Sequence, residues 1–338
     1  MEPHRGLIPY FFELSGEHDT FPAAEAVALC KSETDESHLV TSGEGYAVIA
    51  FRPEFLNNIC ERVALTRRIG RYLGSCRLED AEEFASMLEI PEGTFAVRAK
   101  KFGQSMCEVN AAALSAAIGA SMKKGCKVDL KNPDVELRVL LSSGLHFYIS
   151  EREIDRAVFE DRRVAKRPFF SPISLHPRYA RALINLTGIK KGETLLDPFC
   201  GTGGILLEAA SMGIKAAGSD IDPLMVDGCI ENLQYFGFDA DVQVSDIGSV
   251  PEMFSNITTV VTDPPYGRST STRNEELTSL YDRALKSVSD ILSDGKLCGI
   301  VLPRECPECR YSLEICESHF QRVHRSLTRH YYILRKRD

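Results

Sequence analysis

The sequence predicts an open α/β sheet of the Rossmann-like type in the second half of the chain, preceded by smaller α+β regions. One reason is a glycine-rich turn between a strand-like and a helix-like run within residues 193–210. Another is that aspartates end successive predicted strands around and after this turn. The third is a β-α-β-α order in residues 8–73, which is typical of a small ferredoxin-like unit.

The N-terminal part of the chain carries the pattern of the ferredoxin-like unit. We expect strands at residues 8–14 and 38–51, and helices at 22–31 and 53–73. We therefore predict an N-terminal ferredoxin-like domain over residues 1–76.

The glycine-rich turn follows the strand that ends at Asp197 and is expected to approach a ligand closely. Gly201 and Gly203 permit a tight turn, which a Cβ atom at either position would hinder. A loop that binds phosphate would need a lysine and open N–H groups instead of an aspartate at its start. Asp197 is thus a candidate to hold a cationic amino group.

Aspartates end the next predicted strands as well. Asp220 lies 23 residues after Asp197, a separation that suits a carboxylate binding ribose hydroxyls. Asp246 ends the third strand and is a candidate to receive an adenine amino group, and Asp263 ends the fourth. Because ligands of open α/β sheets bind outside the carboxyl ends of the strands, all four are expected to face one cleft. Taken singly, Asp222 and Asp246 also suit loop or helix N-cap positions.

The most informative stretch follows the β-branched run 257–262 and reads Asp263-Pro264-Pro265-Tyr266-Gly267. A carboxylate, two rigid prolines and an aromatic ring can hold a flat heterocycle that carries an amino group. We expect Tyr266 to stack on the heterocycle while Asp263 and the Pro264 carbonyl accept hydrogen bonds from the amino group. The same residues also suit a loop that merely ends a strand, so the functional interpretation depends on the glycine-rich turn upstream.

These motifs resemble the class I S-adenosylmethionine-dependent methyltransferases, and the stretch at Asp263 resembles motif IV of the amino-methyltransferases. The element Arg167-Pro168-Phe169-Phe170-Ser171-Pro172 and the C-terminal run 322–329 resemble the archaeal and eukaryotic tRNA guanine-N2 methyltransferases that act on position 10 of tRNA. Family members more often carry His where Ser171 stands.

Those enzymes have a THUMP domain ahead of the catalytic domain, and this chain has a similar region. It combines an alanine-rich helix with strand-like runs at 94–101, 127–139 and 145–149. The resemblance therefore implies a THUMP RNA-binding domain at 77–152, a linker at 153–173 and a Rossmann-like methyltransferase domain at 174–338.

The resemblance further implies methyl transfer from S-adenosylmethionine to N2 of a guanosine in tRNA, with one or two methyl groups added. The implied catalytic residues are Asp263, Pro264, Pro265 and Tyr266. The implied cofactor-binding residues are Asp197, Phe199, Gly201, Gly203, Asp220, Ile221, Asp246 and Ile247. Two other functions stay open: methylation of adenine N6 or of a protein glutamine, and RNA binding without catalysis.

The net charge of −8 at first argues against a nucleic-acid partner, but the distribution of basic residues matters more than the sum. Basic residues gather in 97–131 and could form a strip that holds RNA backbone. The expected RNA-binding residues are Arg98, Lys100, Lys101, Lys123, Lys124 and Arg268. Any one of these charges also suits a solvated surface.

The eleven cysteines, spread over the whole length, fit a reducing cytoplasm better than a disulfide framework. Cys306, Cys309, Cys316 and His319 have a spacing that can bind zinc. We expect residues 305–320 to form a helix, which would separate the outer two by roughly 20 Å and leave no metal site. With no apolar run of membrane-spanning length and no signal peptide, the sequence predicts a cytoplasmic protein. The sequence leaves the oligomeric state open, and a monomer is favoured.

Overall fold

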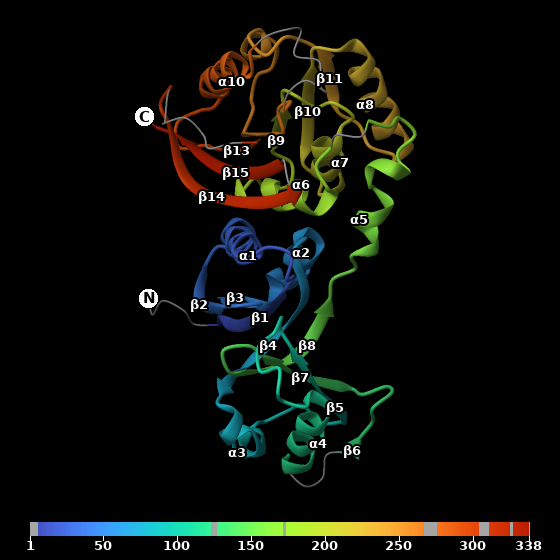
Figure 1. Cartoon of the computed structure of the whole chain (residues 1–338), viewed down its shortest axis with the longest axis vertical. Coiled ribbons are helices and arrows are strands. Elements are labelled where there is room, and N and C mark those ends of the chain that lie inside the picture. The colour runs from blue at the N-terminus through green and yellow to red at the C-terminus, as the bar shows by residue number, and fades with distance from the viewer. Residues whose placement is uncertain are drawn as a thin grey trace. The chain divides into compact units, whose positions relative to one another are not determined.

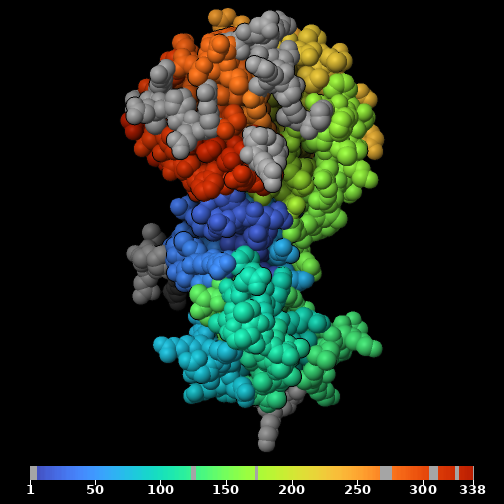
Figure 2. Space-filling view, viewed as in Figure 1, coloured from blue at the N-terminus to red at the C-terminus, as the bar shows by residue number. Residues whose placement is uncertain are grey.

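The computed structural model describes residues 6–122, 127–171, 174–266, 276–303, 311–324 and 327–337. The chain forms two compact units, of which the first contains Met1–Cys60 and Leu65–Asp155 and the second contains Glu61–Ala64 and Arg156–Asp338. In the space-filling view the first unit runs from blue to green and the second from green to red (Figure 2). None of the helices in the described residues is both long and apolar enough to cross a membrane.

The first unit is built on one eight-stranded sheet with the order β2-β3-β1-β4-β8-β7-β5-β6 (Figure 1). The strands are β1 Ile8–Leu14, β2 Ser37–Gly43, β3 Tyr46–Phe51, β4 Thr66–Cys76, β5 Thr94–Lys101, β6 Lys127–Val128, β7 Val135–Leu141 and β8 Leu145–Glu153. The helices are α1 Phe21–Glu33, α2 Leu56–Arg62, α3 Ala81–Met87 and α4 Ala111–Ser121, with short 3-10 turns η1 Pro53–Phe55 and η2 Leu78–Asp80.

Strands β1 to β4 with α1 and α2 have the βαββαβ order of a ferredoxin-like unit, and β1 pairs antiparallel with both β3 and β4. The helix predicted for residues 53–73 is wrong, because this stretch contains α2 and then most of β4. Residues of β4 pair on one side with β1 and on the other with β8, so pairing with distant strands overrides the local pattern. The boundary between residues 76 and 77 stays a prediction, since both regions share the sheet.

The second unit is built on a seven-stranded sheet with the order β11-β10-β9-β12-β13-β15-β14 (Figure 1). Its strands are β9 Thr194–Asp197, β10 Lys215–Asp220, β11 Asp241–Val244, β12 Thr259–Thr262, β13 Leu297–Leu302, β14 Leu313–His324 and β15 Leu327–Lys336. Its helices are α5 Ala157–Asp161, α6 Pro177–Leu186, α7 Gly204–Ser211, α8 Pro223–Tyr235, α9 Val250–Met253 and α10 Leu277–Ile291, with the short turn η3 Val164–Lys166.

Helices cover both faces of this sheet. Successive residues of a strand point to opposite sides, so neighbouring residues of one strand pack against helices on opposite faces. Cys298 and Ile300 of β13 pack with Leu285 of α10 in one core, whereas a Cβ atom on Gly299 would lie 2.9 Å from Leu183 of α6. Strands β9 to β13 run parallel, while β15 runs antiparallel to β13. The order of the sheet reverses between β9 and β12, which places the ligand crevice at their carboxyl ends.

The helix predicted for residues 305–320 is also wrong where the structure describes it. Residues 313–320 belong to strand β14, which pairs with β15 over most of its length. Cys316 and His319 therefore lie on a strand, and His319 is buried beside Glu317. Cys306 and Cys309 lie outside the described residues, so the expectation of no metal site stays a prediction.

Candidate active site

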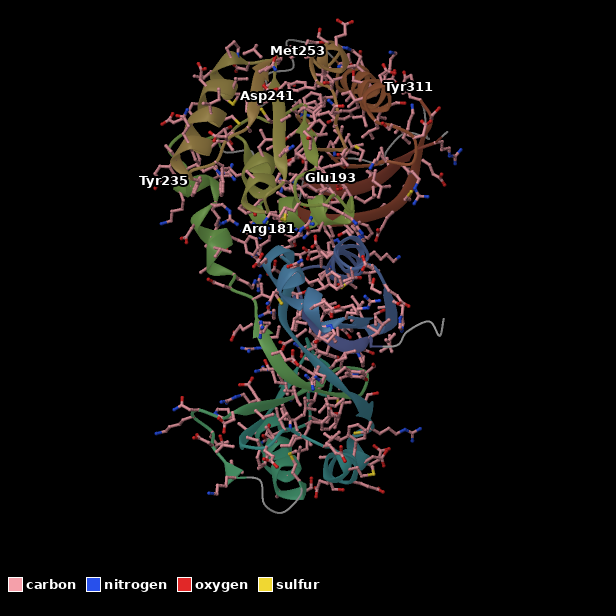
Figure 3. The ribbon with its side chains drawn as sticks, turned by 180° about the vertical axis from the view of Figure 1, so that it is seen from behind. Arg181, Glu193, Tyr235, Asp241, Met253 and Tyr311 are labelled. Carbon is pink, nitrogen blue, oxygen red and sulfur yellow. The ribbon has the colours of Figure 1, made fainter. Side chains whose placement is uncertain are left out.

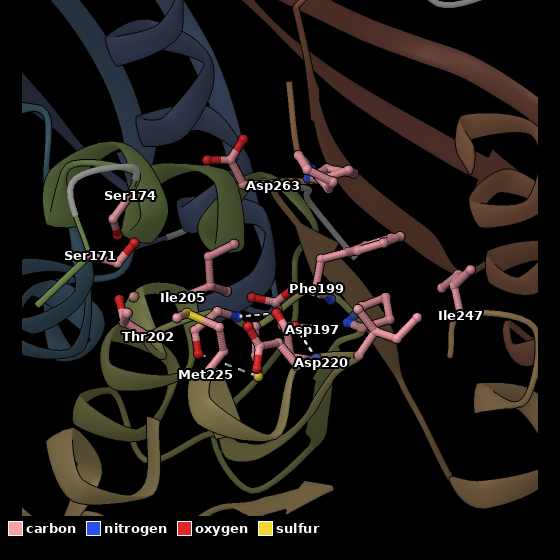
Figure 4. A pocket seen from close by; sticks show the side chains of 18 of the residues that line it. Ser171, Ser174, Asp197, Phe199, Thr202, Ile205, Asp220, Met225, Ile247 and Asp263 are labelled. Carbon is pink, nitrogen blue, oxygen red and sulfur yellow. Dashed lines mark hydrogen bonds between the residues drawn. The ribbon is translucent and has the colours of Figure 1, made fainter. Parts of the chain in front are cut away.

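A cavity of about 270 Å³ opens where the parallel strands of the second unit end. Its wall includes all four strand-ending aspartates that the sequence singled out: Asp197, Asp220, Asp246 and Asp263. Figure 4 shows the cavity from close by, with Asp197 and Asp220 beside Phe199. The expectation that these carboxylates share one cleft is confirmed, because β9 to β12 run parallel and end at the same edge of the sheet.

Asp197 ends β9 and is almost completely buried, at 2% exposure. Its Oδ1 accepts hydrogen bonds from the Thr262 hydroxyl at 2.6 Å and from the Phe199 backbone N–H at 3.2 Å. Burial nevertheless raises its pKa to about 7, and the carboxylates of Asp263 and Asp220 add to the effect. The site thus concentrates negative charge where water is largely excluded.

The glycine-rich turn follows directly and leads into α7. Gly203 caps this helix with a left-handed backbone, at φ +81°, and a Cβ atom there would lie 2.7 Å from the Cys229 sulfur. Gly201 donates its backbone N–H to Asp220 at 3.0 Å. Of the two predicted glycines, Gly201 lines the cavity and brings its backbone close to the end of β10, whereas Gly203 is not among the lining residues and sets the start of α7 by its conformation.

Asp220 joins two loops at the cavity. Its carboxylate accepts from Gly201 N–H and, through the other oxygen, from Asp222 N–H at 3.0 Å. Burial raises its pKa. Asp222 lines the cavity and also caps α8, where its side chain accepts from the Leu224 N–H at 3.0 Å. The N-cap alternative for Asp222 is therefore confirmed.

Asp246 follows β11 and is half-exposed. Its Oδ1 accepts from the Gly248 N–H at 2.9 Å and forms an ion pair with Arg283 of α10. This carboxylate is therefore held by protein groups, and a contact to an adenine amino group would have to use Oδ2. Phe199, Ile221 and Ile247 also line the cavity, where they provide apolar surface between the carboxylates.

The Asp263 motif begins directly after β12. The Tyr266 hydroxyl donates to Asp263 Oδ1, and the Tyr281 hydroxyl of α10 donates to the Pro265 carbonyl at 2.7 Å. Burial raises the pKa of Asp263 to about 7, while the guanidinium of Arg329 lowers it. Asp263, Pro264, Pro265 and Tyr266 all line the cavity. Gly267 and Arg268 lie outside the described residues.

Residues 162–171 contact the glycine-rich turn, and we call this segment the strap. The sequence by itself assigned no contacts to it. Asn232 of α8 holds it by accepting from the Phe169 N–H at 3.0 Å and donating to the Phe169 carbonyl at 3.1 Å. The same amide donates to the Thr202 carbonyl in the turn at 3.0 Å. Arg167 donates to the Thr202 hydroxyl at 3.3 Å. The strap and the glycine-rich turn are thus built as one structure.

A buried carboxylate anchors the start of the strap. Glu208 of α7 is fully buried and accepts from Arg162 Nε at 2.6 Å and from Arg181 Nε at 2.9 Å. Figure 3 labels Arg181, which comes from α6. At the other end of the strap, Ser171 lines the cavity. In the sequence, the strap was marked only by the Arg-Pro-Phe-Phe-Ser-Pro element. Its hydrogen-bond partners lie on helices that come later in the sequence, so the element alone does not predict them.

The cavity fits a nucleoside that carries positive charge. Three carboxylates, at Asp197, Asp220 and Asp263, have raised pKa values because burial disfavours their charged form, and a cationic ligand would relieve this. The apolar side chains between them suit the flat face of a base. The sulfonium and amino groups of S-adenosylmethionine are cationic, so these residues fit that cofactor.

The predicted RNA-binding residues of the first unit make contacts on their own sheet. Arg98 of β5 donates to Glu136 at 3.0 Å, and Lys100 donates to the buried Glu13 at 2.6 Å. Lys101 donates to a backbone carbonyl at 2.7 Å. Because the side chains of Arg98 and Lys100 are 42% and 45% exposed, both remain open to solvent, and their role in RNA binding stays a prediction. Lys123 and Lys124 lie outside the described residues.

The strand order of the second unit, with one antiparallel strand near its edge and a glycine-rich turn after β9, defines a class I methyltransferase fold. The family model of the RMKL-like methyltransferase domain matches residues 164–331, and that of the THUMP domain matches 79–149. Among solved structures, TrmN from Thermus thermophilus has a TM-score of 0.55 at 20% identity, covering 97% of this chain and 99% of that one. A putative methyltransferase complexed with SAH, SMU.472, has a TM-score of 0.54 at 14% identity, covering 99% and 100%. These structures share the fold.

Closer relatives carry a specific name. The tRNA (guanine(10)-N2)-dimethyltransferase of Methanothermobacter thermautotrophicus is 36% identical over 94% of this chain and 96% of its own length. The protein of the same name from Pyrococcus abyssi is 37% identical, over 82% and 86%. The chain therefore belongs to the family of THUMP-domain methyltransferases that includes the archaeal tRNA (guanine(10)-N2)-dimethyltransferases.

Proposed function

We propose that this protein transfers methyl groups from S-adenosylmethionine to N2 of the guanosine at position 10 of tRNA, and that it does so twice. The observation that carries the proposal is that the Asp263 motif and the glycine-rich turn line one cavity. Relatives that match nearly the whole chain carry the corresponding name. The tRNA-binding role of the THUMP region, the monomeric state and the cytoplasmic location are parts of the proposal.

The cofactor would lie against the first strands of the second unit. Asp197 and the glycine-rich turn would hold its amino-acid portion, and Asp220 its ribose hydroxyls. Phe199, Ile221 and Ile247 would cover the adenine. When bound, S-adenosylmethionine supplies an electrophilic methyl group on a sulfonium. The strap is joined to the turn by Asn232, which bonds both Phe169 and Thr202, and by Arg167, which donates to Thr202.

The guanine would lie against Asp263 and Tyr266. Its amino lone pair is delocalised into the ring, so the protein has to orient the amino group before it can act as a nucleophile. Because the Tyr266 hydroxyl occupies Oδ1 of Asp263, the other oxygen is left to accept one amino hydrogen, and the Pro264 carbonyl accepts the other. These two acceptors turn the lone pair toward the methyl group, and alignment supplies most of the catalysis.

The proton released from N2 has a ready acceptor. A carboxylate whose pKa lies near 7 takes up a proton at neutral pH more readily than an ordinary aspartate does. Asp263 would therefore receive the proton after transfer, and exchange with water would restore the carboxylate. A second methylation requires the monomethylated base to return with its one remaining N–H aimed at one of these two acceptors.

The experiment is methylation of an unmodified tRNA transcript by the purified chain with labelled S-adenosylmethionine, followed by nucleoside analysis. We expect N2,N2-dimethylguanosine, with N2-methylguanosine appearing first. A transcript with adenosine at position 10 is the control for the nucleotide, and Asp263→Asn is the control for the site, since it keeps the size of the side chain. Methylated adenosine, or no nucleoside product from a protein that binds the cofactor, would refute the proposal.

A further inference from the structure

Arg329 belongs to a strand that is not adjacent to β12 in the sheet, yet it lies beside the candidate active site. It lies on β15, which runs antiparallel to β13 and pairs His330 with Leu302, the last residue of β13. Residue 329 is therefore one step past the carboxyl end of the parallel strands. This is the edge at which β12 delivers Asp263, although the two residues are 66 positions apart in the sequence.

The guanidinium of Arg329 lies over the ring of Tyr266, with its central carbon 5.8 Å from the ring centroid. Tyr266 in turn donates its hydroxyl to Asp263. Within the described residues, Arg329 Nε is buried and makes no hydrogen bond. A buried cationic N–H group without a partner is costly, and the contacts of Arg329 that offset this cost are the Tyr266 ring, the nearby Asp263 carboxylate and a side-chain hydrogen bond with Tyr331.

From this geometry we propose that Arg329 is a positioning residue of the methyl-transfer site, which holds the Tyr266 ring and supplies the cation next to Asp263. The inference rests on the proposed function, because it assigns Arg329 a role in orienting the target base. A guanidinium that lies over one face of Tyr266 leaves the opposite face for the base. Fixing the ring also fixes the hydroxyl that occupies Asp263 Oδ1.

The charges that surround Asp263 in the described residues make the role of Arg329 testable by pH. Asp197, at the end of the neighbouring strand, interacts unfavourably with Asp263. Tyr331, on the same strand as Arg329, also interacts with both Asp263 and Arg329. Arg329 lowers the pKa of Asp263 against burial. Removing this cation leaves Asp263 facing another carboxylate, so its proton would be held to a higher pH.

The test compares Arg329→Gln with Arg335→Gln, which removes an exposed arginine from the same strand. We expect Arg329→Gln to lower the single-turnover methylation rate by about 10- to 100-fold while cofactor affinity stays unchanged. The acid limb of its pH–rate profile moves to higher pH. Arg329→Lys keeps the positive charge but lacks the planar guanidinium. We therefore expect its acid limb to lie where that of the wild type lies, and its methylation rate to recover only in part.

A second readout does not depend on substrate. Carbon-13 NMR of labelled aspartate carboxyls, assigned with Asp263→Asn, reports the pKa of Asp263 in the protein alone. We expect this pKa to rise in Arg329→Gln and to stay in place in Arg335→Gln. If wild-type protein methylates no tRNA, the proposed function fails while the NMR titration still decides whether Arg329 acts on Asp263. Equal rates, equal pH profiles and equal titrations in the two glutamine variants would overturn the inference.

Discussion

The hydroxyl of Thr262, the last residue of β12, donates a hydrogen bond of 2.6 Å to the buried carboxylate of Asp197, the last residue of β9. The two strands are neighbours in the sheet although the residues are 65 positions apart. The bond joins the strand that leads to the glycine-rich turn with the strand that leads to the Asp263 motif. It therefore sets the relative placement of the proposed cofactor and guanine sites.

Replacing Thr262 by valine should weaken cofactor binding. Valine has the shape of threonine but cannot donate, so Asp197 would lose a hydrogen bond that lowers its pKa and would hold its negative charge less well. We expect S-adenosylmethionine affinity to fall by about tenfold, which corresponds to ~1.4 kcal/mol for the lost bond. Isothermal titration calorimetry measures it. Thr262→Ser keeps the hydroxyl and should bind as the wild type does; equal affinity of the valine variant would refute the role.

Replacing Asp197 by asparagine should stabilise the protein above neutral pH. The pKa of Asp197 is raised from 3.8 to about 7 in the folded chain. The folded state therefore binds more protons than the unfolded state between about pH 4 and pH 7, and the free energy of unfolding falls as pH rises through this range. Asparagine cannot ionise and still accepts from Thr262. We expect the gain in stability to be larger at about pH 8 than at about pH 5, by roughly 1–3 kcal/mol.

Urea unfolding at the two pH values measures this gain. The matched control is Asp227→Asn, an exposed position on α8, which should change neither value. The asparagine variant at position 197 should also lose cofactor affinity, so that stability and binding move in opposite directions. A destabilised Asp197→Asn at the higher pH would contradict the assignment of a buried, unfavourably ionised carboxylate.

Replacing Glu208 by glutamine should destabilise the second unit strongly. The carboxylate is fully buried and is shared by Arg162 and Arg181, so its neutralisation leaves two guanidinium groups without a counter-charge. We expect a loss of about 3–5 kcal/mol in the free energy of unfolding. Glu160→Gln removes an exposed partner of Arg163 and should cost less than about 1 kcal/mol. Similar losses of unfolding free energy in both variants would show that the buried ion pairs of Glu208 contribute no more to stability than the exposed pair of Glu160.

Replacing Gly228 by alanine should displace the strap. Alanine normally stabilises a helix interior by about 1 kcal/mol relative to glycine. At position 228 of α8, however, a Cβ atom would lie 2.1 Å from the Phe169 ring. We expect Gly228→Ala to lower stability by about 1–3 kcal/mol and to weaken cofactor binding. In a Phe169→Ala background the same change should be tolerated.

The control for this pair is Gly119→Ala in α4, where the nearest atom would lie at an ordinary 3.7 Å. That substitution should stabilise the first unit by up to about 1 kcal/mol. Thermal unfolding of the four variants completes the comparison. A stabilised Gly228→Ala would show that Phe169 does not pack on α8 in solution.

The sequence by itself determined the α/β class of the second half, the glycine-rich turn and the aspartates that end its strands. These features follow from local patterns, because strand ends and tight turns are encoded by neighbouring residues. The shared cleft followed as well, since parallel strands end at one edge. The same local reasoning failed for residues 66–73, whose strand pairs with the distant β1, and for residues 313–320, which pair with the next strand, β15.

Only the tertiary structure decided which groups surround each aspartate. The bond from Thr262 to Asp197, the clamp of Asn232 on Phe169 and the position of Arg329 over Tyr266 join residues more than sixty positions apart. No local pattern encodes such pairs, because each forms only when the order of strands and helices brings two segments together. Burial then raises the pKa values of Asp197 and Asp263. Even the charge of these two predicted residues therefore depends on tertiary packing, which includes residues far along the chain such as Arg329.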